Sequence, residues 1–537
     1  MARITSITQF TGFKKFEKSW KLGKSRNLEN LENPEYLENS GHHLVKPPII
    51  RLRSFVGHSF LFPQKLISPF SLRNELNLLS LWVQRKLIDM KKILNISLLL
   101  SFLATAFVGF AQNENWKNVS FKKFFEDRTL RVDYLRVGNH DRDTNFLIRY
   151  VEKPGQWAGS QTQLLDPINN GDYRILVTDA ATGTPLYSRC YHTLFREYKD
   201  TPMAVDSIAQ FEEVMLIPYP KQAVNICMQK RDKKQRFFTQ NSYFFDPKHS
   251  QVEVLHGWSD MEGNGVNAKC FEPIALQKKG DVHKKIDVVI VAEGYGLSDT
   301  AKMRKDLDYF TQCLFGREPF KSHRNEFNVW GVAVPSTQSG ITDPTKGIYV
   351  QSAVGSSYNT FNSDRYLMTS SLFQLHDVIA QAPYDHIIIM ANCPTYGGGA
   401  IYNFYAMSAV LPMSENILPH ELGHSIGGLA DEYVDDELTY NSLYPLDQEP
   451  IEPNITTLID FESKWKDLVD PSTPVPTPDC ELPSAMGTCG VIGAYEGGGY
   501  VAKGIYRPMM NCMMKYYAPF CPVCTRALEA VFDLYTK

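Results

Sequence analysis

The sequence predicts an all-β sandwich domain followed by an α/β domain, and two patterns along the chain support this order. Between about residues 115 and 275, short β-favouring runs alternate with turn-forming clusters such as 169–172. After a polar linker at 277–281, continuous apolar runs of strand length alternate with segments of helical periodicity. We therefore expect the sandwich over residues 112–276 and the α/β domain over residues 283–537.

The individual elements follow from composition and periodicity. Runs rich in β-branched and aromatic residues predict strands of the first domain at 129–137, 145–151, 173–177, 214–217, 223–228 and 251–255. In the second domain, apolar runs predict buried strands at 286–292, 327–334 and 386–391, and helical periodicity predicts helices at 298–314 and 371–380. The first domain contains no catalytic cluster of ionisable residues, so we expect it to position or bind a substrate.

The composition is that of an ordinary globular protein. Of the 537 residues, 43% are hydrophobic and 21% are charged, and the formal net charge is -3. Binding to a phosphate backbone requires a basic excess that this chain lacks, so nucleic acid is not expected as a partner. The length predicts at least two packed units, and the sequence leaves the oligomeric state open.

A secretory signal peptide is expected at residues 90–111. Met90 and two lysines precede an apolar run, and the small residues Gly109 and Ala111 precede a cut after Ala111. A single transmembrane anchor is the alternative, because the run is about long enough to span a bilayer. Polar residues within the run favour the signal peptide. We therefore expect export to the periplasm, the cell surface or the medium, with no integral membrane span after cleavage.

Residues 1–89 stand before this signal, although signal peptides occupy the extreme N-terminus of a protein. The segment shows no sustained helical or strand periodicity. We interpret it as an upstream translated extension that is not part of the mature protein. A genuine N-terminal pre-domain is the alternative.

All ten cysteines follow the expected cut, so export makes disulfides possible without specifying them. Cys480 with Cys489, and Cys512 with either Cys521 or Cys524, are plausible local pairs. Cys521 and Cys524 also have the spacing of half a zinc ribbon, but no second C-x-x-C completes one. A structural disulfide or free thiols is the favoured interpretation.

The segment His420-Glu421-Leu422-Gly423-His424 is the candidate reaction centre. Histidines four residues apart lie about 40° apart around a helix, so both imidazoles can reach one zinc ion. Glu421 is turned by about 100° and can act as a general base on the water that zinc activates. Short H-E-x-x-H matches also arise by chance on helices with two exposed histidines. Here Gly427 and Gly428 follow, where a helix stops, and carboxylates come directly after them.

Residues 420–433 read HELGHSIGGLADEY. Together with 495–500, 506–508, 511–514 and 520–524 they resemble the bacterial IgA-peptidase family of zinc metallopeptidases. The resemblance extends over about residues 115–537. It implies a metzincin-like zinc peptidase domain with one catalytic Zn²⁺, a long helix carrying the two histidines, and a methionine turn beneath the metal.

The third zinc ligand departs from the metzincin pattern H-E-x-x-H-x-x-G-x-x-H. Ala430 stands where that pattern has its third histidine, and two carboxylates follow it. We expect Asp431 to be the third ligand beside His420 and His424, with Glu432 as the alternative. The carboxylate that is not a ligand is expected to be an N-cap or to form a surface salt bridge.

Two further segments near the motif have open roles. Met513 or Met514 is expected to form the methionine turn, with plain core packing as the alternative. Tyr516 has the Met-x-Tyr spacing that follows such turns, so it either donates to an oxyanion or is a buried structural tyrosine. The glycine-rich segment 395–400 either pairs with an extended substrate at the rim of a cleft or is a loop without a partner.

The expected function is a secreted zinc endopeptidase that hydrolyses protein or peptide substrates, with Glu421 as general base. A secreted glycan- or protein-binding module with an idle metal site is the alternative, but an idle site would tolerate loss of Glu421. A zinc hydrolase with a non-peptide substrate is a third hypothesis. Immunoglobulin is not established as the substrate, because specificity lies in cleft loops.

The mature protein is predicted to begin at Gln112, because cleavage after Ala111 satisfies the small-residue rule. N-terminal sequencing of protein secreted by its native host checks this. Detection of any residue from 1–89 in the mature chain would contradict both the extension and the signal assignment.

Overall fold

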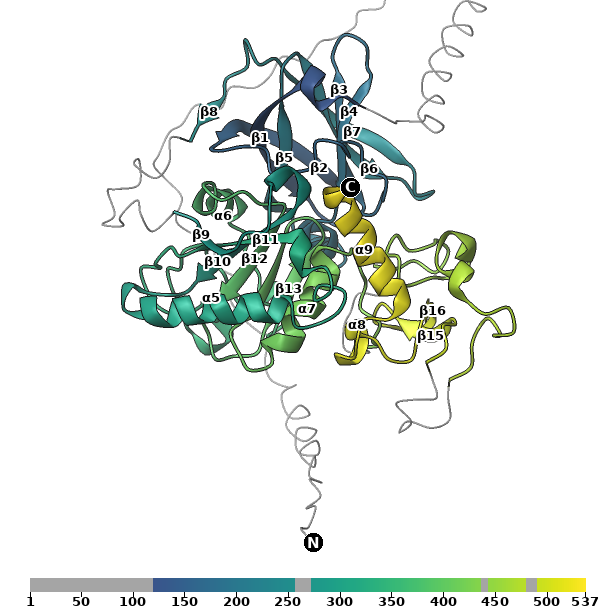
Figure 1. Cartoon of the computed structure of the whole chain (residues 1–537). Coiled ribbons are helices and arrows are strands. Elements are labelled where there is room, and N and C mark those ends of the chain that lie inside the picture. The colour runs from purple at the N-terminus through teal and green to yellow at the C-terminus, as the bar shows by residue number, and fades with distance from the viewer. Residues whose placement is uncertain (1–118, 256–271, 436–442, 480–489) are drawn as a thin grey trace, which may run out of the picture. The chain divides into compact units, whose positions relative to one another are not determined.

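The computed structural model describes residues 119–255, 272–435, 443–479 and 490–537 (Figure 1). All of them fall within one folded unit, Phe110–Lys537. The predictions for residues 1–89 and 90–111, and the pairing of Cys480 with Cys489, lie outside the described residues. No helix within the described ranges is long and apolar enough to cross a membrane.

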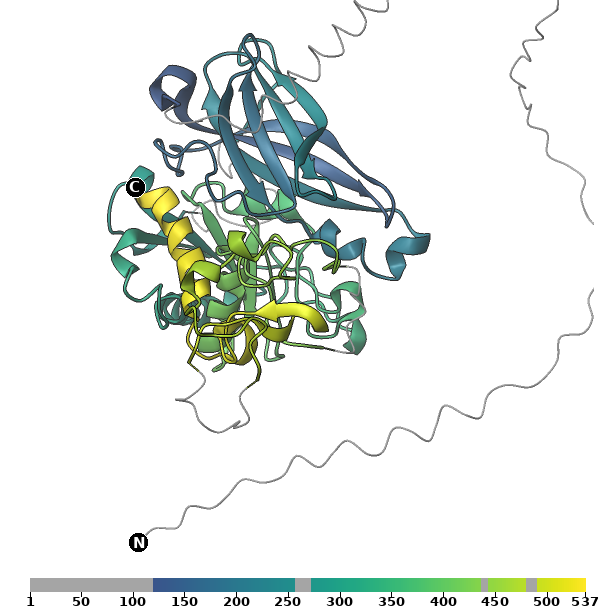
Figure 2. The same ribbon diagram turned by 90° about the vertical axis from the view of Figure 1, so that its right-hand side faces the viewer.

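The N-terminal region is all-β, as predicted, and its described part forms two four-stranded sheets (Figure 2). One has the order β5-β1-β2-β8 and the other β4-β3-β6-β7. The strands are β1 (Phe125–Gly138), β2 (Asp143–Lys153), β3 (Tyr173–Asp179), β4 (Pro185–Tyr191), β5 (Ala209–Pro220), β6 (Val224–Arg231), β7 (Phe237–Phe245) and β8 (Glu253–Val254). Short helices α2 (Phe121–Phe124), α3 (Leu194–Tyr198) and α4 (Met203–Asp206) accompany them. The sequence analysis missed β4 and β7, in which polar residues interrupt the apolar pattern.

Strand β1 is buried on both of its faces. Leu130, Val132 and Tyr134 point into the core between the two sheets, where the Tyr134 hydroxyl donates to the Tyr191 hydroxyl across 3.0 Å. Successive residues of a strand point to opposite sides, so Arg131 and Asp133 face outward. These two residues are nevertheless 1% and 0% exposed, because the second domain covers them.

The second domain is a mixed α/β unit, as predicted. Its six-stranded sheet has the order β13-β14-β12-β10-β11-β9, with four parallel central strands and antiparallel strands at both edges. The strands are β9 (Ile274–Gln277), β10 (Ile286–Glu293), β11 (Phe327–Val332), β12 (His386–Ala391), β13 (Gly398–Ile401) and β14 (Tyr405–Ala409). Helices α5 (Thr300–Leu314) and α6 (Leu372–Val378) coincide with the two expected helices to within two residues.

Strand β10 has a continuous apolar run at residues 288–292, and its two faces pack against different cores. Val289 and Val291 belong to the core shared with the N-terminal sheets, whereas Val288 and Ile290 belong to the core that also contains residues of α5. A strand covered on both faces gains no stability from polar residues on either side. The central sheet is therefore packed between the N-terminal domain and a helical layer.

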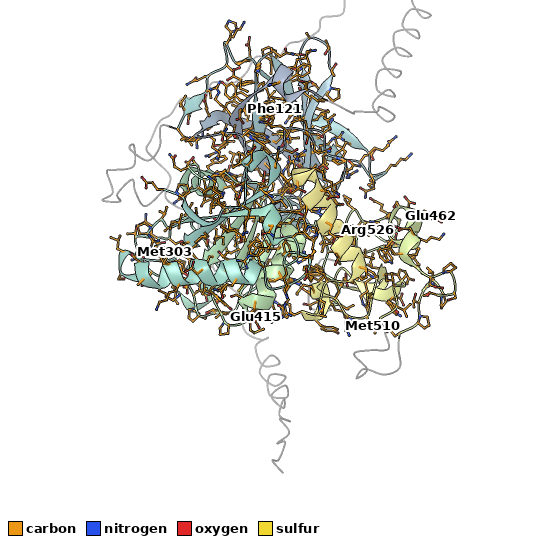
Figure 3. All side chains as sticks on the ribbon, in the orientation of Figure 1. Phe121, Met303, Glu415, Glu462, Met510 and Arg526 are labelled. Atoms are coloured by element: carbon orange, nitrogen blue, oxygen red, sulfur yellow. The ribbon has the colours of Figure 1, made fainter. Side chains whose placement is uncertain are left out.

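The helical layer carries the H-E-x-x-H residues. It contains α5, α7 (Ser414–Ser425) and α9 (Pro522–Thr536), and α7 contacts α5, β13, β14 and α8 (Met513–Tyr516). Figure 3 shows the buried Met303 on α5 and Glu415 in the first turn of α7. The two-stranded sheet of β15 (Tyr495–Gly498) and β16 (Val501–Arg507) lies between α7 and α8 in the sequence.

Arg131 joins the two domains, because its guanidinium contacts Asp133 at 2.6 Å and Asp377 of α6 at 2.5 Å. Replacement by Met leaves two carboxylates without their buried partner, and we expect the free energy of unfolding to fall by about 3–5 kcal/mol. Chemical denaturation measures the change. Arg128→Met is the matched control on the same strand, since its ion pairs with Glu126 and Glu152 are partly exposed to solvent; a loss of about 0–1 kcal/mol is expected there. Equal losses in both variants would contradict the role of Arg131.

Candidate active site

Helix α7 presents His420 and His424 on one side, and their Nε2 atoms lie 3.2 Å apart. Asp431 comes from the segment after the helix and places Oδ1 at 3.1 Å from His420 Nε2 and 3.4 Å from His424 Nε2. The structure thus brings together the three residues that the sequence analysis chose as ligands.

These three atoms form a set that fits a cation. Asp431 is 5% exposed, and its Oδ1 makes no hydrogen bond within the described residues. A buried carboxylate oxygen without a donor is costly unless a positive charge compensates it. Two imidazole nitrogens and one carboxylate oxygen are also the ligand types of a three-residue catalytic zinc site with an open fourth position.

Surrounding groups orient each of the three side chains. His420 Nδ1 lies 3.0 Å from the Met513 carbonyl oxygen, and His424 Nδ1 lies 2.6 Å from that of Leu429. Because a carbonyl only accepts, each Nδ1 carries a proton, and Nε2 is the ring atom through which each histidine would bind a metal. The Tyr500 hydroxyl donates to Asp431 Oδ2 at 2.5 Å, which leaves Oδ1 directed at the histidines.

A reversal of the chain at Gly428 produces this arrangement. Gly428 has φ +59°, a conformation that glycine adopts without strain, and its N–H donates to the His424 carbonyl. The Leu429 N–H also donates to a carbonyl of the helix, that of Gly423, at 3.1 Å. The reversal therefore brings both the Leu429 carbonyl and Asp431 to the histidine side of the helix.

Electrostatics in the site follow from the close approach of charged groups. Burial is the largest single influence on His424 and opposes its protonation, but the charge and hydrogen bond of Asp431, together with the charge of Glu421, raise the pKa of this histidine to about 9. Burial raises the pKa of Glu421, and the two histidines oppose that rise. A carboxylate with a raised pKa is better suited to accept and return a proton near neutral pH.

Glu421 lies against edge strand β13. A Cβ atom on Gly398 would come within 2.8 Å of Glu421 Oε1, so only glycine leaves room for the carboxylate there. The glycine-rich segment therefore forms one wall of the site. One backbone group on the free edge of β13 is already paired within the protein, because the Gly398 carbonyl accepts from the Leu367 N–H at 3.3 Å.

Met513 and Met514, the two residues expected to form the methionine turn, both lie against helix α7. The Met513 carbonyl contacts His420, and the Met514 sulfur lies where a Cβ on Gly423 would approach it to 2.6 Å. Tyr516 is 65% exposed and is not a buried structural tyrosine. The ring of Tyr517 lies nearer the centre, 5.7 Å from that of His420, and its hydroxyl contacts that of Tyr396 at 2.8 Å. The sequence analysis did not select Tyr517, because it relied on spacing alone.

Glu432 points away from the histidines. It is fully buried, so it is neither an N-cap nor part of a surface salt bridge, and its Oε1 accepts from Asn454 Nδ2 at 3.0 Å. Its other neighbours are Cys512, Cys521 and Cys524, which the structure shows as free thiols. No expected local disulfide is therefore present among these three cysteines.

His420 and His424 line a cleft with a volume of about 650 Å³. The N-terminal domain supplies part of its wall through His192, Arg196 and Glu197. Burial raises the pKa of Glu197 to about 7, and the Tyr366 hydroxyl donates to this carboxylate at 2.6 Å. No pattern in the sequence marks these residues, because only the packing of α3 beside the second domain brings them to the site.

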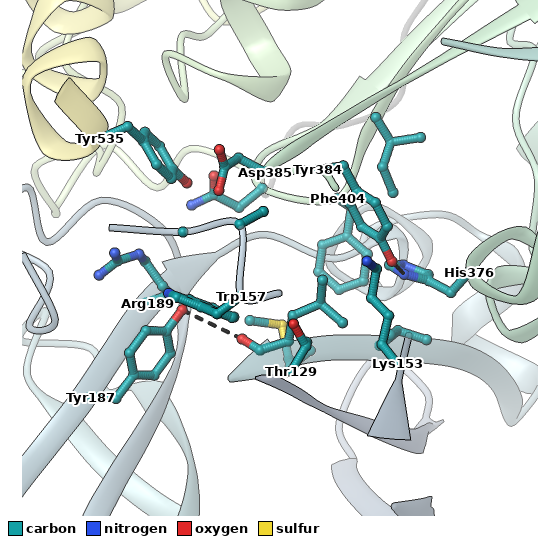
Figure 4. A pocket seen from close by; sticks show the side chains of 17 residues that line it. Thr129, Lys153, Trp157, Tyr187, Arg189, His376, Tyr384, Asp385, Phe404 and Tyr535 are labelled. Atoms are coloured by element: carbon teal, nitrogen blue, oxygen red, sulfur yellow. Dashed lines mark hydrogen bonds between the residues drawn. The ribbon is translucent and has the colours of Figure 1, made fainter. Parts of the chain in front are cut away.

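A second cavity lies between the two domains (Figure 4). His376 Nδ1 and the Tyr384 hydroxyl are 2.8 Å apart there, and burial lowers the pKa of Lys153 to about 7. Its volume of about 80 Å³ has room for only about two or three water molecules. The cavity is thus too small for a peptide, and the cleft beside His420 is the candidate substrate site.

Comparison with known protein families agrees with this site. The family model described as IgA Peptidase M64 matches residues 274–483 and 479–532, which include all the residues of the candidate centre. The model described as Peptidase M64 N-terminus matches residues 120–242. No individual curated protein matches the chain.

Removal of the Tyr500 hydroxyl tests how Asp431 is oriented. In Tyr500→Phe, Asp431 loses the Tyr500 hydroxyl as one of its hydrogen-bond donors, and we expect metal affinity at the histidine centre to fall about 10- to 100-fold. Competition with a chromophoric chelator measures the affinity. Tyr349→Phe is the control, since Tyr349 is 73% exposed and lies outside the cleft lining. An unchanged affinity in Tyr500→Phe would contradict this role.

Proposed function

Because the chain belongs to the IgA peptidase M64 family, which is a family of metallopeptidases, we propose that it is an exported zinc endopeptidase with Glu421 as its general base. The observation that carries this proposal is the convergence of His420 Nε2, His424 Nε2 and Asp431 Oδ1 beside a buried carboxylate, at the floor of a large cleft. His420, His424 and Asp431 would hold the single catalytic zinc ion.

Zinc bound by these residues supplies Lewis acidity, which polarises a scissile carbonyl and lowers the pKa of a water molecule. The protein's own groups then handle the protons. Glu421 accepts the proton of the attacking water and returns it to the leaving amine. The ring of Tyr517 packs against that of His420, which supports a role for its hydroxyl as a donor to a developing oxyanion.

The cleft walls favour an extended peptide as substrate. Strand β13 is the edge of the central sheet, and an extended chain can add to such an edge by backbone hydrogen bonds. The contact between Gly398 and Leu367 confines this pairing to the part of the edge beyond Gly398. Arg196, Glu197 and Tyr366 also line the cleft and provide charged and polar groups for substrate side chains.

A metzincin-like arrangement is part of the proposal. Its support is the helix that carries both histidines, the glycine that reverses the chain after it, and the methionine segment beneath. Asp431 in place of a third histidine is the departure from that pattern. Export rests on the signal-like segment 90–111, and the family name does not by itself make immunoglobulin the substrate.

Two substitutions separate the proposed roles. Glu421→Gln should lower kcat by about 100- to 10,000-fold with zinc content unchanged, because Glu421 moves protons and is not a ligand. Asp431→Ala should lose zinc from the histidine centre, because a ligand oxygen is removed. Metal analysis and mass-spectrometric mapping of cleavage sites in a mixed protein library provide the readouts.

Zinc retention with full activity in both variants would contradict the assignment of the site. A zinc-loaded wild-type protein that cleaves no peptide bond would instead support the binding-module alternative.

A further inference from the structure

Four buried side chains form a second cluster of potential metal ligands, apart from His420, His424 and Asp431. Glu432, Cys512 and Cys524 are fully buried and Cys521 is 3% exposed. One carboxylate oxygen and three sulfur atoms of these residues all lie within 4.8 Å of one another. The cluster combines the loop after α7 with the starts of α8 and α9, which are distant from that loop in the sequence.

Two separations between ligand atoms of this cluster fit a tetrahedral zinc ion. Cys512 Sγ lies 3.6 Å from Cys524 Sγ, and Cys524 Sγ lies 3.3 Å from Glu432 Oε1. Zinc bonds of about 2.3 Å to sulfur and about 2.0 Å to oxygen place two sulfurs about 3.8 Å apart and a sulfur and an oxygen about 3.5 Å apart. The observed separations are close to both values. A disulfide would instead require about 2.05 Å between two sulfurs.

The cluster also contains a buried carboxylate oxygen without a hydrogen bond in the described part of the chain. Glu432 Oε2 makes no hydrogen bond within the described residues, although the side chain is completely buried. Protein groups orient the other atoms: Asn454 donates to Glu432 Oε1, the Cys521 N–H donates to Cys512 Sγ at 3.4 Å, and the Cys524 N–H donates to Cys521 Sγ at 3.5 Å. Backbone N–H donors to sulfur and an amide on the carboxylate are supporting contacts of the kind found around metal ligands.

We propose that Cys512, Cys521, Cys524 and Glu432 bind a structural zinc ion, separate from the centre at His420, His424 and Asp431. Thiolate ligands select zinc over magnesium or calcium. Four protein ligands leave no open position for a substrate, so this site is structural. Binding releases the thiol protons to solvent.

Such an ion would stabilise the geometry of the active site. Asp431 and Glu432 are neighbours that serve different centres, and the Glu432 N–H donates to the Met514 carbonyl at 2.8 Å. Cys512 precedes Met513, whose carbonyl orients His420. An ion held by Glu432 and Cys512 therefore connects the segment that supplies Asp431 with the segment that supports His420.

Metal analysis of the purified protein tests the proposal. We expect two zinc ions per wild-type chain and one in the double variant H420A/H424A. After replacement of zinc by cobalt, H420A/H424A should retain the near-ultraviolet thiolate-to-cobalt charge-transfer absorption. The double variant C521S/C524S should lose this absorption, whereas C227S, which changes a cysteine outside the cluster, should retain it.

Glu432→Gln provides a milder change in case C521S/C524S does not fold. Gln keeps the size of the side chain but loses its charge, so cobalt should leave the thiolate site at a lower chelator concentration than in wild type. Absence of metal from folded H420A/H424A, or a disulfide among the three cysteines in non-reduced peptides, would overturn the proposal. Because these readouts do not depend on peptide cleavage, they remain decisive if the proposed activity fails.

Discussion

The rest of the site depends on the reversal of the chain at Gly428. Helix α7 supplies two of the three proposed ligands, His420 and His424, and the third comes from the segment after the helix. The left-handed conformation of Gly428 returns the chain within a few residues and places Asp431 opposite the histidines. The same reversal positions the Leu429 carbonyl that orients His424. The proposed third ligand and a contact that orients His424 thus both depend on one backbone feature.

Burial of polar groups links the reversal to the surrounding fold. Asp431 is held by Tyr500, and Asn454 contacts both the backbone of Ala430 and the side chain of Glu432. Asn454 and Tyr500 come from two different segments that follow helix α7 in the sequence. The loop after α7 is therefore held by interactions with several C-terminal segments, and the proposed thiolate zinc site would add a further connection.

The N-terminal domain packs against the second domain and also contributes side chains to the cleft. Its outward-facing Arg131 pairs with Asp377 across the domain boundary, and α3 places Glu197 in the cleft. Sequence analysis assigned the domain a positioning or binding role from the absence of a catalytic pattern. The structure adds the particular side chains that reach the cleft, which come from a short helix between strands and carry no recognisable spacing.

Local patterns in the sequence were sufficient for the order of the two domains, most strands, the helix with His420, Glu421 and His424, and the glycine that ends it. These features depend on residues close together in the chain, where periodicity and backbone preference act directly. Adjacent carboxylates share the same local pattern, so spacing alone left Asp431 and Glu432 as alternatives. Tertiary packing separated them, because it directed Asp431 toward the histidines and buried Glu432 among three cysteines. The positions of Tyr517 and Glu197 likewise required the folded chain, since their partners are set by contacts between segments far apart in sequence.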